Sequence, residues 1–455
     1  MRILLLSCSF PPIGGMTPLL AAQFARELVR RGHDVDVLTI DPSERHPVYR
    51  LDAASEAIVP TEVRVTRAYA GPLHHAACHV AQPGEGLAAA RTRRARGERV
   101  AWRQRLALML RPLLFPDSRI DCAPWVLAAG RRLMRRTRYD VLLSIAPPDT
   151  DTVIAWALAA PAGLPWVTHQ GDLWSFGLGP DIQAQPRWRR ALDRAVETRL
   201  MRRMDRIMVL TPEMRDLCLS VFPALPPEKF TIVTPGYDPA EYASVPAEPP
   251  AAGTFRIVYT GLFYEGMRQP DRFFDGVARL AAGRTDVEVV VAGNIGRDAS
   301  ARIARLCGDA RTVFLGHQPH HRVVALQKGA SVLLLLCWEG GYGFAAKAFE
   351  YIAARRPIVA VDYDGRDPAA RFVRMRRRGL AVANDAEAVH RALAELDHLW
   401  AADRLTTVFD LDEVPDFAWS AVGQRVEETL LAACETRRRV SRASVLRPAG
   451  EWQHK

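Results

Sequence analysis

The stretch VLLLLCWEGGYGFAAKAFEYIAARRPIVAVD (332–362) carries the clearest fold signal in this chain. It begins with a continuous apolar run and passes through a turn that contains Gly340, Gly341 and Gly343. A helical pattern follows, and a second apolar run begins at Pro357. A strand, a glycine-rich turn, a helix and another buried strand form one unit of a parallel sheet. This stretch therefore predicts an α/β fold.

Short apolar runs alternate with helix-length amphipathic stretches on both sides of this segment. In the first half of the chain, strands are predicted at residues 2–7, 34–40, 64–69, 141–145, 166–169, 206–211 and 230–236. In the second half they are predicted at residues 255–261, 287–293, 312–316, 332–336, 357–362 and 380–383. Continuous apolar strands between helices are typical of parallel sheets covered on both faces. We expect two doubly wound, Rossmann-like domains facing a cleft, with the carboxyl ends of their strands toward it.

The domain boundaries follow from composition. Residues 235–254 are rich in Pro and Ala and lack periodicity, which predicts a linker. We expect an amino-terminal domain over 1–240 and a carboxyl-terminal domain over 255–415. Two segments fall outside the alternation. They are an Arg-rich insertion, 85–116, and a tail whose first part, 416–436, is predicted to be a helix that packs back on the amino-terminal domain.

Composition and charge narrow the class of protein. The chain has 455 residues, 49% hydrophobic and 25% charged, which excludes disordered, collagen-like and coiled-coil classes. No apolar run is long enough to span a bilayer, and the 7 Cys are scattered without metal-ligand spacing, so we expect free thiols and a cytoplasmic location. The net charge of +10 favours negatively charged partners, such as nucleotide phosphates, anionic lipid or nucleic acid.

Basic and acidic side chains near strand ends in the second half are candidates for ligand binding. Lys347 and Glu350 are three residues apart on a predicted helix and share one face. A cation near a helix start suits phosphates, and a carboxylate one turn later suits ribose hydroxyls; an intrahelical ion pair is the alternative. Arg268 follows the strand at 255–261, where a guanidinium can grip a diphosphate bidentately; a solvated surface Arg is the alternative.

A glycine turn after the first strand is a second candidate. Gly14 and Gly15 lie between the strand at 2–7 and a helix predicted to begin near Pro18. Backbone N–H groups at such a turn bind an anion or a sugar hydroxyl. The alternative is a tight turn in which glycine only permits the backbone path.

The segment KAFEYIAARRPIVAV (347–361) resembles the Lys-x-x-Glu-Tyr-x-Ala-x-x-x-Pro signature of glycosyltransferases with the GT-B architecture, in particular the family 4 group. Other segments resemble that family in the same order along the chain: FPPIGG (10–15), LVRRGHDVDVLT (28–39), RMDRIMVLTPEM (203–214), TPGYDP (234–239), FRIVYTGLF (255–263) and VFLGHQPHHRVVALQKGASVLLLL (313–336). The resemblance covers about residues 1–45 and 139–400. It implies transfer of a sugar from a nucleotide-diphosphate sugar, with retention of configuration.

The resemblance implies roles for charged side chains. Glu350 matches the family glutamate that hydrogen-bonds the donor ribose, and Arg268 and Lys347 fall where basic residues contact the donor diphosphate. Many members have a second glutamate, eight positions earlier, that holds the transferred sugar. This chain has Tyr342 there, with Glu339 nearby but out of register, so sugar recognition differs from the family pattern.

The resemblance also implies backbone contacts with the donor. Gly343 and Phe344 fall where main-chain amides approach the donor phosphate or sugar. Gly14 and Gly15 match the amino-terminal loop near the donor phosphates, and Gly261 ends the first strand of the donor domain. We therefore include these five residues, with Tyr342, in the donor-binding set.

The segment LPWVTHQGDLWS (164–175) ends a strand with polar residues that resemble the sugar-facing strand end of family members. Asp172 and Trp174 are kept, whereas Gly171 stands where many members have Arg. His169 is predicted to donate a hydrogen bond to the transferred sugar or the acceptor. The alternative is a strand-end histidine bonded to backbone.

The run Asp149-Thr150-Asp151 has the spacing of a metal site in transferases of another fold. After Pro147 and Pro148 it is better interpreted as the acidic start of a helix. We therefore predict no metal and no cofactor other than the nucleotide-sugar substrate.

The leading hypothesis is a metal-independent hexosyl- or glycosyltransferase acting on a hydroxyl of a glycan, a lipid-linked saccharide or a small molecule. Two alternatives stay open: a non-catalytic nucleotide-sugar-binding protein with a decayed transferase fold, and a nucleotide-sugar epimerase. The basic segment 91–111 suggests an anionic membrane surface as partner and a peripheral position at the inner face of the cell membrane. A solvated helix is its alternative, and no nucleic-acid motif accompanies it.

Overall fold

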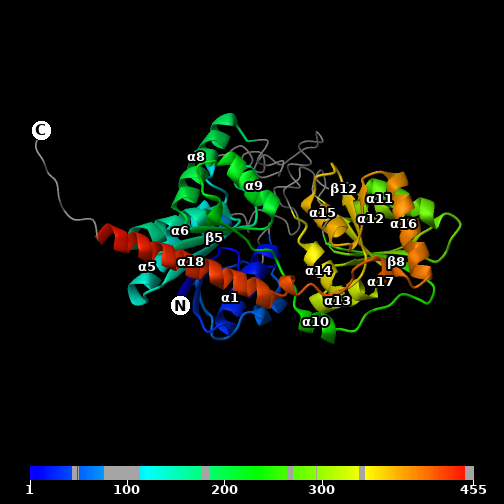
Figure 1. Cartoon of the computed structure of the whole chain (residues 1–455), viewed down its shortest axis with the longest axis horizontal. Coiled ribbons are helices and arrows are strands. Elements are labelled where there is room, and N and C mark those ends of the chain that lie inside the picture. The colour runs from blue at the N-terminus through cyan, green and yellow to red at the C-terminus, as the bar shows by residue number, and fades with distance from the viewer. Residues whose placement is uncertain are drawn as a thin grey trace, which may run out of the picture. The chain divides into compact units, whose positions relative to one another are not determined.

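The computed structural model describes residues 1–43, 49, 51–75, 113–176, 185–261, 263, 270–293, 295–337 and 344–445. These residues form two compact units, each described here by itself (Figure 1). Unit 1 holds the described residues of Met1–Leu210, Cys218–Val233 and Gly423–Lys455, and unit 2 those of Thr211–Leu217 and Thr234–Val422. Each unit is built on a parallel sheet flanked by helices, which confirms the predicted pair of Rossmann-like α/β domains.

Unit 1 contains a seven-stranded sheet of order β3-β2-β1-β4-β5-β6-β7, in which all neighbours are parallel. Its strands are β1 (Arg2–Leu6), β2 (Asp34–Ile40), β3 (Arg64–Ala68), β4 (Val141–Ala146), β5 (Trp166–Gln170), β6 (Arg206–Val209) and β7 (Phe230–Ile232). Its helical segments are α1 (Met16–Arg30), η1 (Ala53–Ile58), η3 (Ile120–Cys122), α5 (Ala123–Arg136), α6 (Asp149–Ala162), α8 (Arg187–Arg203), α9 (Pro212–Val221, whose first part belongs to unit 2) and η4 (Pro227–Lys229). Right-handed crossovers place α1 on one face and α5 and α6 on the other.

Unit 2 contains a six-stranded parallel sheet of order β10-β9-β8-β11-β12-β13. Its strands are β8 (Phe255–Thr260), β9 (Val287–Ala292), β10 (Arg311–Gly316), β11 (Val332–Leu336), β12 (Ile358–Asp362) and β13 (Gly379–Ala383). Its helical segments are α10 (Pro239–Ser244), α11 (Asp271–Ala281), α12 (Arg297–Leu306), α13 (His320–Gly329), α14 (Lys347–Ala353), α15 (Pro368–Met375), α16 (Ala386–Ala401), α17 (Leu405–Val408) and η5 (Pro415–Phe417). Every strand predicted from the sequence is present in one of the two sheets.

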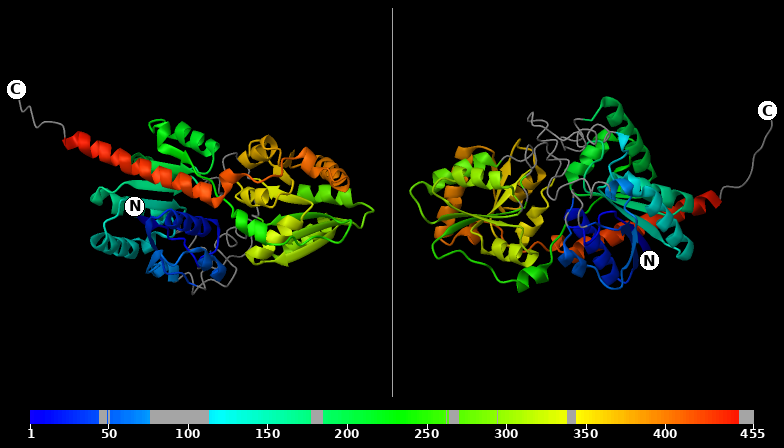
Figure 2. Two further views of the ribbon diagram at one scale, coloured as in Figure 1. Left: turned by 60° about the horizontal axis from the view of Figure 1, so that its bottom comes forward. Right: turned by 180° about the vertical axis from the view of Figure 1, so that it is seen from behind.

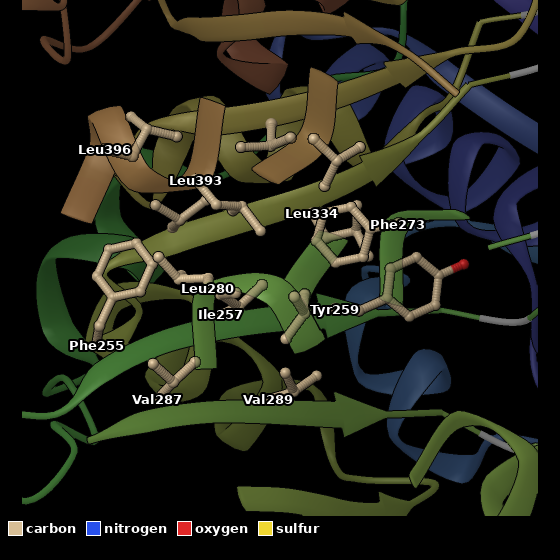
Figure 3. Close-up of a cluster of buried hydrophobic side chains, with 14 of the residues drawn as sticks. Phe255, Ile257, Tyr259, Phe273, Leu280, Val287, Val289, Leu334, Leu393 and Leu396 are labelled. Atoms are coloured by element: carbon tan, nitrogen blue, oxygen red, sulfur yellow. The ribbon is translucent and has the colours of Figure 1, made fainter. Parts of the chain in front are cut away.

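Apolar side chains cover both faces of the unit 2 sheet. On one face, side chains of β8, β9 and β11 meet those of α11 and α16, among them Phe255, Phe273 and Leu393 (Figure 3). Gly276 lets α11 approach α16, because an added Cβ would lie 2.6 Å from the Val389 side chain. The opposite face is covered by α13, α14 and α15. A sheet buried on both faces explains why its strands are continuous apolar runs.

The last helix, α18 (Trp419–Val445), crosses the amino-terminal edge of the unit 1 sheet, where it is the long red helix of Figure 2. Three of its contacts, each with a residue directly before a strand, are Glu427 with His33 at 2.8 Å, Cys434 with the Asp140 carbonyl at 3.6 Å and Arg437 with Asp205 at 2.9 Å. The helix continues beyond the predicted bound of 436 to Val445, and the Arg437–Asp205 ion pair lies one residue past that bound.

Expectations from the sequence also concern the Arg-rich insertion, the cysteines and membrane-spanning helices. The Arg-rich insertion, 85–116, lies outside the described residues except for its last four. Six of the cysteines lie in the described residues, where all six are buried free thiols. In that same part of the chain, no helix is long and apolar enough to cross a membrane.

Candidate functional site

Glycines line the carboxyl edge of the unit 2 sheet. Gly261 and Gly293 follow β8 and β9, and Gly316 ends β10. The Gly261 N–H donates to the Ala292 carbonyl at 2.9 Å, and the Gly293 N–H donates to the Gly316 carbonyl at 2.8 Å. A Cβ on Gly293 would overlap the Gly261 carbonyl oxygen. Bare backbone at this edge lets a ligand approach closely.

Glu350 lies in the first turn of α14, and its side chain is 12% exposed. The Lys347 ammonium lies 2.8 Å from Oε1 and 2.6 Å from Oε2, and the Gln327 amide donates to Oε2 at 3.1 Å. Burial alone would raise the pKa of the Glu350 carboxyl, but the charges of Lys347 and His320 and these hydrogen bonds outweigh it and lower the pKa below its ordinary value. The carboxylate is therefore ionised at neutral pH and accepts hydrogen bonds.

The predicted alternative for Lys347 and Glu350, an intrahelical ion pair, is present in the structure. It differs from a surface pair because the carboxylate is mostly buried while the Lys347 side chain is 35% exposed. An ammonium group has three N–H donors, and Glu350 receives two of them. Lys347 can therefore hold Glu350 and still present a donor and a positive charge to a phosphate.

The remaining predicted donor residues have mixed outcomes. Arg268, Tyr342 and Gly343 lie outside the described residues. The Phe344 ring stacks on Phe349 with a centroid separation of 4.9 Å and belongs to the apolar cover of the sheet. Its side chain is therefore a packing element, and only its backbone amide is available for the predicted donor contact.

In unit 1, the glycine turn leads from β1 into α1. Gly15 is the residue before the first turn of α1, is exposed, and has a φ of 130°, a conformation that favours glycine. No side chain caps this helix start among the described residues. The first N–H groups of α1 therefore have no side-chain acceptor, as the anion-binding hypothesis for Gly14 and Gly15 requires.

His169 lies on β5 with no exposed surface. Its Nε2 is 3.2 Å from the Val233 carbonyl, and the ring packs edge-on against Phe24. Burial lowers the pKa of His169 to about 4, so the ring is neutral at pH 7. Because a carbonyl can only accept, Nε2 holds the proton and Nδ1 is an acceptor. The strand-end alternative therefore describes the contacts of His169 in this structure, and its hydrogen bond to a sugar or acceptor stays a prediction.

Asp172 and Trp174 follow β5 but differ in environment. Asp172 keeps exposed surface, although surrounding atoms desolvate its carboxyl and raise its pKa above the usual range. Trp174 is buried, and its indole N–H donates to Asp193 at 2.9 Å. Glu197 accepts hydrogen bonds from the backbone N–H groups of Trp174 and Ser175, at 3.2 and 3.1 Å. Two buried carboxylates on α8 thus fix the loop that carries Asp172.

Carboxylates gather at the carboxyl edge of unit 1. Burial raises the pKa of Asp149 well above its usual range, and neighbouring negative charges raise it further. These neighbours are Asp117, Glu197, Asp172 and Asp193. Sequence reasoning missed this group because its members come from four separate segments. The Asp117 carboxylate also accepts from the Thr150 N–H at 2.9 Å and so fixes the start of α6.

The Asp149-Thr150-Asp151 run begins α6 at Asp149, as the helix interpretation predicts. Asp151 is fully buried, and its carboxylate accepts the Cys8 N–H at 2.8 Å. Burial raises the pKa of Asp151 to about 7. Within the described part of the chain, no three His, Cys, Asp or Glu side chains lie together as metal ligands would.

Gln327 and Tyr242 are polar residues near Glu350 that sequence reasoning did not select. Gln327 has no exposed surface, and the Tyr242 hydroxyl donates to its amide oxygen at 2.8 Å. The signal was a glutamine three positions after Val324, in the apolar face of the helix HHRVVALQKG. A buried polar residue in such a face needs hydrogen-bond partners, and Gln327 finds them in Tyr242 and Glu350.

Comparisons with known proteins agree with this architecture. A family profile described as "Glycosyl transferases group 1" matches residues 254–397, and one described as "Glycosyl transferase 4-like domain" matches residues 14–236. Together they cover most of both units. Among proteins with curated descriptions, no sequence match was found.

Three solved structures share the fold over nearly the whole chain. Sucrose-phosphate synthase from Thermosynechococcus elongatus aligns with a TM-score of 0.58 at 16% identity, covering 98% of this chain and 99% of that one. A putative UDP-N-acetylglucosamine 2-epimerase from Listeria monocytogenes gives 0.57 at 10%, covering 96% and 97%. The lipopolysaccharide outer core galactosyltransferase WaaB gives 0.56 at 13%, covering 95% and 99%. At these identities the likeness establishes the fold alone.

Proposed function

This chain belongs to the group 1, family 4-like glycosyltransferases, which use nucleotide sugars, and from that premise we propose that it moves a sugar from a nucleotide-diphosphate sugar to a hydroxyl of a glycan, a lipid-linked saccharide or a small molecule. The observation that carries the proposal is the mostly buried Glu350 carboxylate, kept ionised by Lys347 near the glycine-lined edge of unit 2. A carboxylate in that setting suits ribose hydroxyls, and the adjacent ammonium suits phosphate.

In the proposed donor site, Glu350 accepts hydrogen bonds from the ribose. Lys347 and Arg268 face the diphosphate, whose negative charge grows as the bond to the sugar breaks. Fixed positive charge at that place stabilises the leaving group and replaces a metal ion, so we propose metal-independent transfer. The Gly343 and Phe344 amides and Gly261 allow the phosphates to approach the backbone, and Tyr342 takes the place of the family's sugar-holding glutamate.

In the proposed acceptor domain, unit 1, Asp172 keeps exposed surface and its carboxylate is suited to accept a hydrogen bond from an acceptor hydroxyl. Gly14 and Gly15 offer the N–H groups at the start of α1 to a donor phosphate. His169 stabilises this edge of the sheet through its hydrogen bond to the Val233 carbonyl, which joins the end of β5 to the segment after β7. Retention follows if the acceptor attacks from the face that the nucleotide leaves, so that catalysis depends on positioning.

The proposed partners include an anionic membrane surface, through residues 91–111, and a cytoplasmic location at the inner face of the cell membrane. The support is the density of Arg in that segment, since each basic group near an anionic surface adds about 1 kcal/mol. Co-sedimentation with anionic vesicles, using chains with and without residues 91–111, tests it. Equal pelleting of both proteins removes the membrane from the proposal.

The experiment for the central proposal is a thermal-shift screen across nucleotide sugars, because a ligand that binds the native state raises its melting temperature. The nucleotide sugar that raises the melting temperature most is then incubated with the protein and with pooled glycan and lipid-linked acceptors. Release of the nucleoside diphosphate is measured. We expect release that depends on acceptor, is lost in Glu350→Ala and is kept in the control Glu395→Ala, which alters an exposed glutamate on α16.

Two results contradict transfer. Conversion of the donor to another nucleotide sugar without acceptor indicates the epimerase alternative, visible in a proton spectrum. Binding without turnover on any acceptor pool indicates the decayed transferase.

A further inference from the structure

Gln327 of α13 is a buried side chain whose amide is fully engaged on the donor side of unit 2. Its Nε2 donates to Thr260 Oγ1 at 3.0 Å and to Glu350 Oε2 at 3.1 Å, and its Oε1 accepts from the Tyr242 hydroxyl at 2.8 Å. These partners come from β8, α14 and α10, so one side chain joins three separate elements. A buried amide with this many partners holds its neighbours in fixed positions.

The orientation of this amide follows from its partners. The ionised Glu350 carboxylate can only accept hydrogen bonds, so it must face the NH2 group of Gln327. The Thr260 hydroxyl accepts from the same NH2 group and donates to the Tyr351 hydroxyl at 3.3 Å. The Tyr242 hydroxyl then donates to the amide oxygen. The Gln327 amide, the Thr260 hydroxyl and the Tyr242 hydroxyl thus each donate to an acceptor.

The helix α10, which carries Tyr242, is itself fastened to α13. The Lys328 ammonium donates to the carbonyl of Tyr242, in α10, and to that of Val245, the residue directly after α10. The His320 ring lies 3.3 Å from Glu241. Tyr242 is therefore held at a fixed distance from Gln327, and its hydroxyl cannot leave the amide without moving α10.

The hydrogen bonds divide the two oxygens of Glu350 unequally. Oε2 accepts from both Lys347 and Gln327, whereas Oε1 accepts from Lys347. A carboxylate oxygen has about two lone-pair sites. Among the contacts of the described residues, Oε2 is therefore saturated and Oε1 keeps a lone pair for a further donor.

We propose that Gln327 is a positioning residue for the donor: it fixes Glu350 so that Oε1 presents its open lone pair to a ribose hydroxyl, and Tyr242 fixes Gln327. The inference rests on the proposed function of Glu350 as the ribose ligand and extends it to two residues that do not touch the nucleotide. It makes the preference for ribose over deoxyribose depend on a glutamine in another helix.

The same contact affects the acid limit of donor binding. The groups that lower the pKa of Glu350 are Lys347 on α14 and His320 and Gln327 on α13. The charge of Glu350 raises the pKa values of Tyr351 on α14 and Tyr242 on α10, and Glu241 on α10 contacts His320. The Gln327 hydrogen bond lowers the pKa of Glu350, so its removal raises that pKa. The ionised carboxylate is the stronger hydrogen-bond acceptor, so affinity in the variant falls at a higher pH as the solution is acidified.

The test is calorimetry with the nucleoside diphosphate that binds best among UDP, GDP and ADP, and with its 2′-deoxy and 3′-deoxy forms. Gln327→Met keeps the volume and removes the donor. We expect about tenfold weaker binding of the ribonucleotide, a much reduced preference over at least one deoxy form, and an acid midpoint at higher pH. Tyr242→Phe, which removes one hydroxyl, should cause the same changes at about threefold.

Val324→Ala is the matched control, because it removes buried volume from α13 without touching the amide network. It should lower the melting temperature and leave the ribose preference unchanged. If Glu350→Ala leaves the preference intact, the proposed function of Glu350 fails. If Glu350→Ala abolishes the ribose preference while Gln327→Met and Tyr242→Phe retain both that preference and the pH profile of binding, the positioning role of Gln327 is overturned. If Gln327→Met does not fold, the ribose preference and the acid midpoint of Tyr242→Phe decide whether the positioning role holds.

Discussion

The carboxyl edges of the two sheets have the same topology but opposite electrostatics. In unit 2, Glu350 is paired with Lys347 and its pKa is lowered although it is mostly buried. In unit 1, carboxylates crowd together, and burial raises the pKa values of Asp149 and Glu197. The fold alone therefore does not determine what an edge binds. The partners placed behind each carboxylate decide whether it remains ionised.

The largest expected effect comes from filling the glycine edge of unit 2. Gly293→Ala places a Cβ on the Gly261 carbonyl oxygen, in a backbone conformation that favours glycine. We expect a loss of about 4 kcal/mol of unfolding free energy from overlap and strain together, measured by urea denaturation.

Gly283→Ala is its control, because Gly283 also has a positive φ but has no atom within 4 Å of an added Cβ. It should cost about 1 kcal/mol. Equal effects of the two substitutions would mean that the edge of unit 2 is not tightly packed.

A pH effect in unit 1 is next in size. The pKa of Asp151 is raised to about 7 in the folded protein, so the native state binds more protons than the unfolded state between about pH 4 and pH 7. Asp151 therefore makes the protein less stable as the pH rises through that window, by about 4 kcal/mol in all. Asp151→Asn, which keeps an acceptor for the Cys8 N–H, should remove this slope and be the more stable protein at pH 7.5. Parallel stability–pH curves for the two proteins would contradict the assignment.

One kind of substitution, a carboxylate replaced by its amide, compares the two units directly. Glu350→Gln leaves the Lys347 ammonium without its carboxylate and should cost about 2 kcal/mol. Asp149→Asn removes a charge from the crowded acidic edge, where burial and neighbouring carboxylates raise the pKa of Asp149, and should stabilise by about 1 kcal/mol. Thermal denaturation at pH 7 measures both. Shifts of the same sign would remove the contrast between the edges.

The smallest effect is expected far from either site. Glu427→Ala removes contacts of α18 with Arg31 and His33 at the amino edge of unit 1, and should cost about 1 kcal/mol. Glu428→Ala, whose hydrogen bond to Gln424 is exposed, is the control and should change stability little. Neither should alter nucleotide binding. A changed nucleotide affinity in Glu427→Ala would contradict the division of roles between the two edges of the sheet.

The sequence predicts much of the fold because burial on both faces imposes continuous apolar strands. The runs FRIVYT (255–260) and VLLLL (332–336) are such strands, and both are central in unit 2. Local spacing also places Lys347 and Glu350 on one face. The helical start at Asp149 follows from the two prolines before it. These features depend on near neighbours in the chain, which a sequence displays directly.

What the sequence does not display depends on residues brought together by folding. The proton position on His169 is set by Val233, which lies 64 residues away on another segment. The pKa of Asp149 reflects carboxylates from α8 and from the loops near Asp117 and Asp172. Gln327 is recognisable as a buried polar residue, but its partners on α10, α14 and β8 are fixed by tertiary packing.

The most direct measurement of the central claim is calorimetry of nucleoside diphosphate binding at pH 7.5 to the unchanged protein, to Glu350→Gln and to the control Glu395→Gln. Loss of the carboxylate removes a charged acceptor for the ribose, so we predict binding at least about thirtyfold weaker in Glu350→Gln and unchanged in the control. Equal affinity in all three folded proteins would contradict the assignment of Glu350 as the ribose ligand.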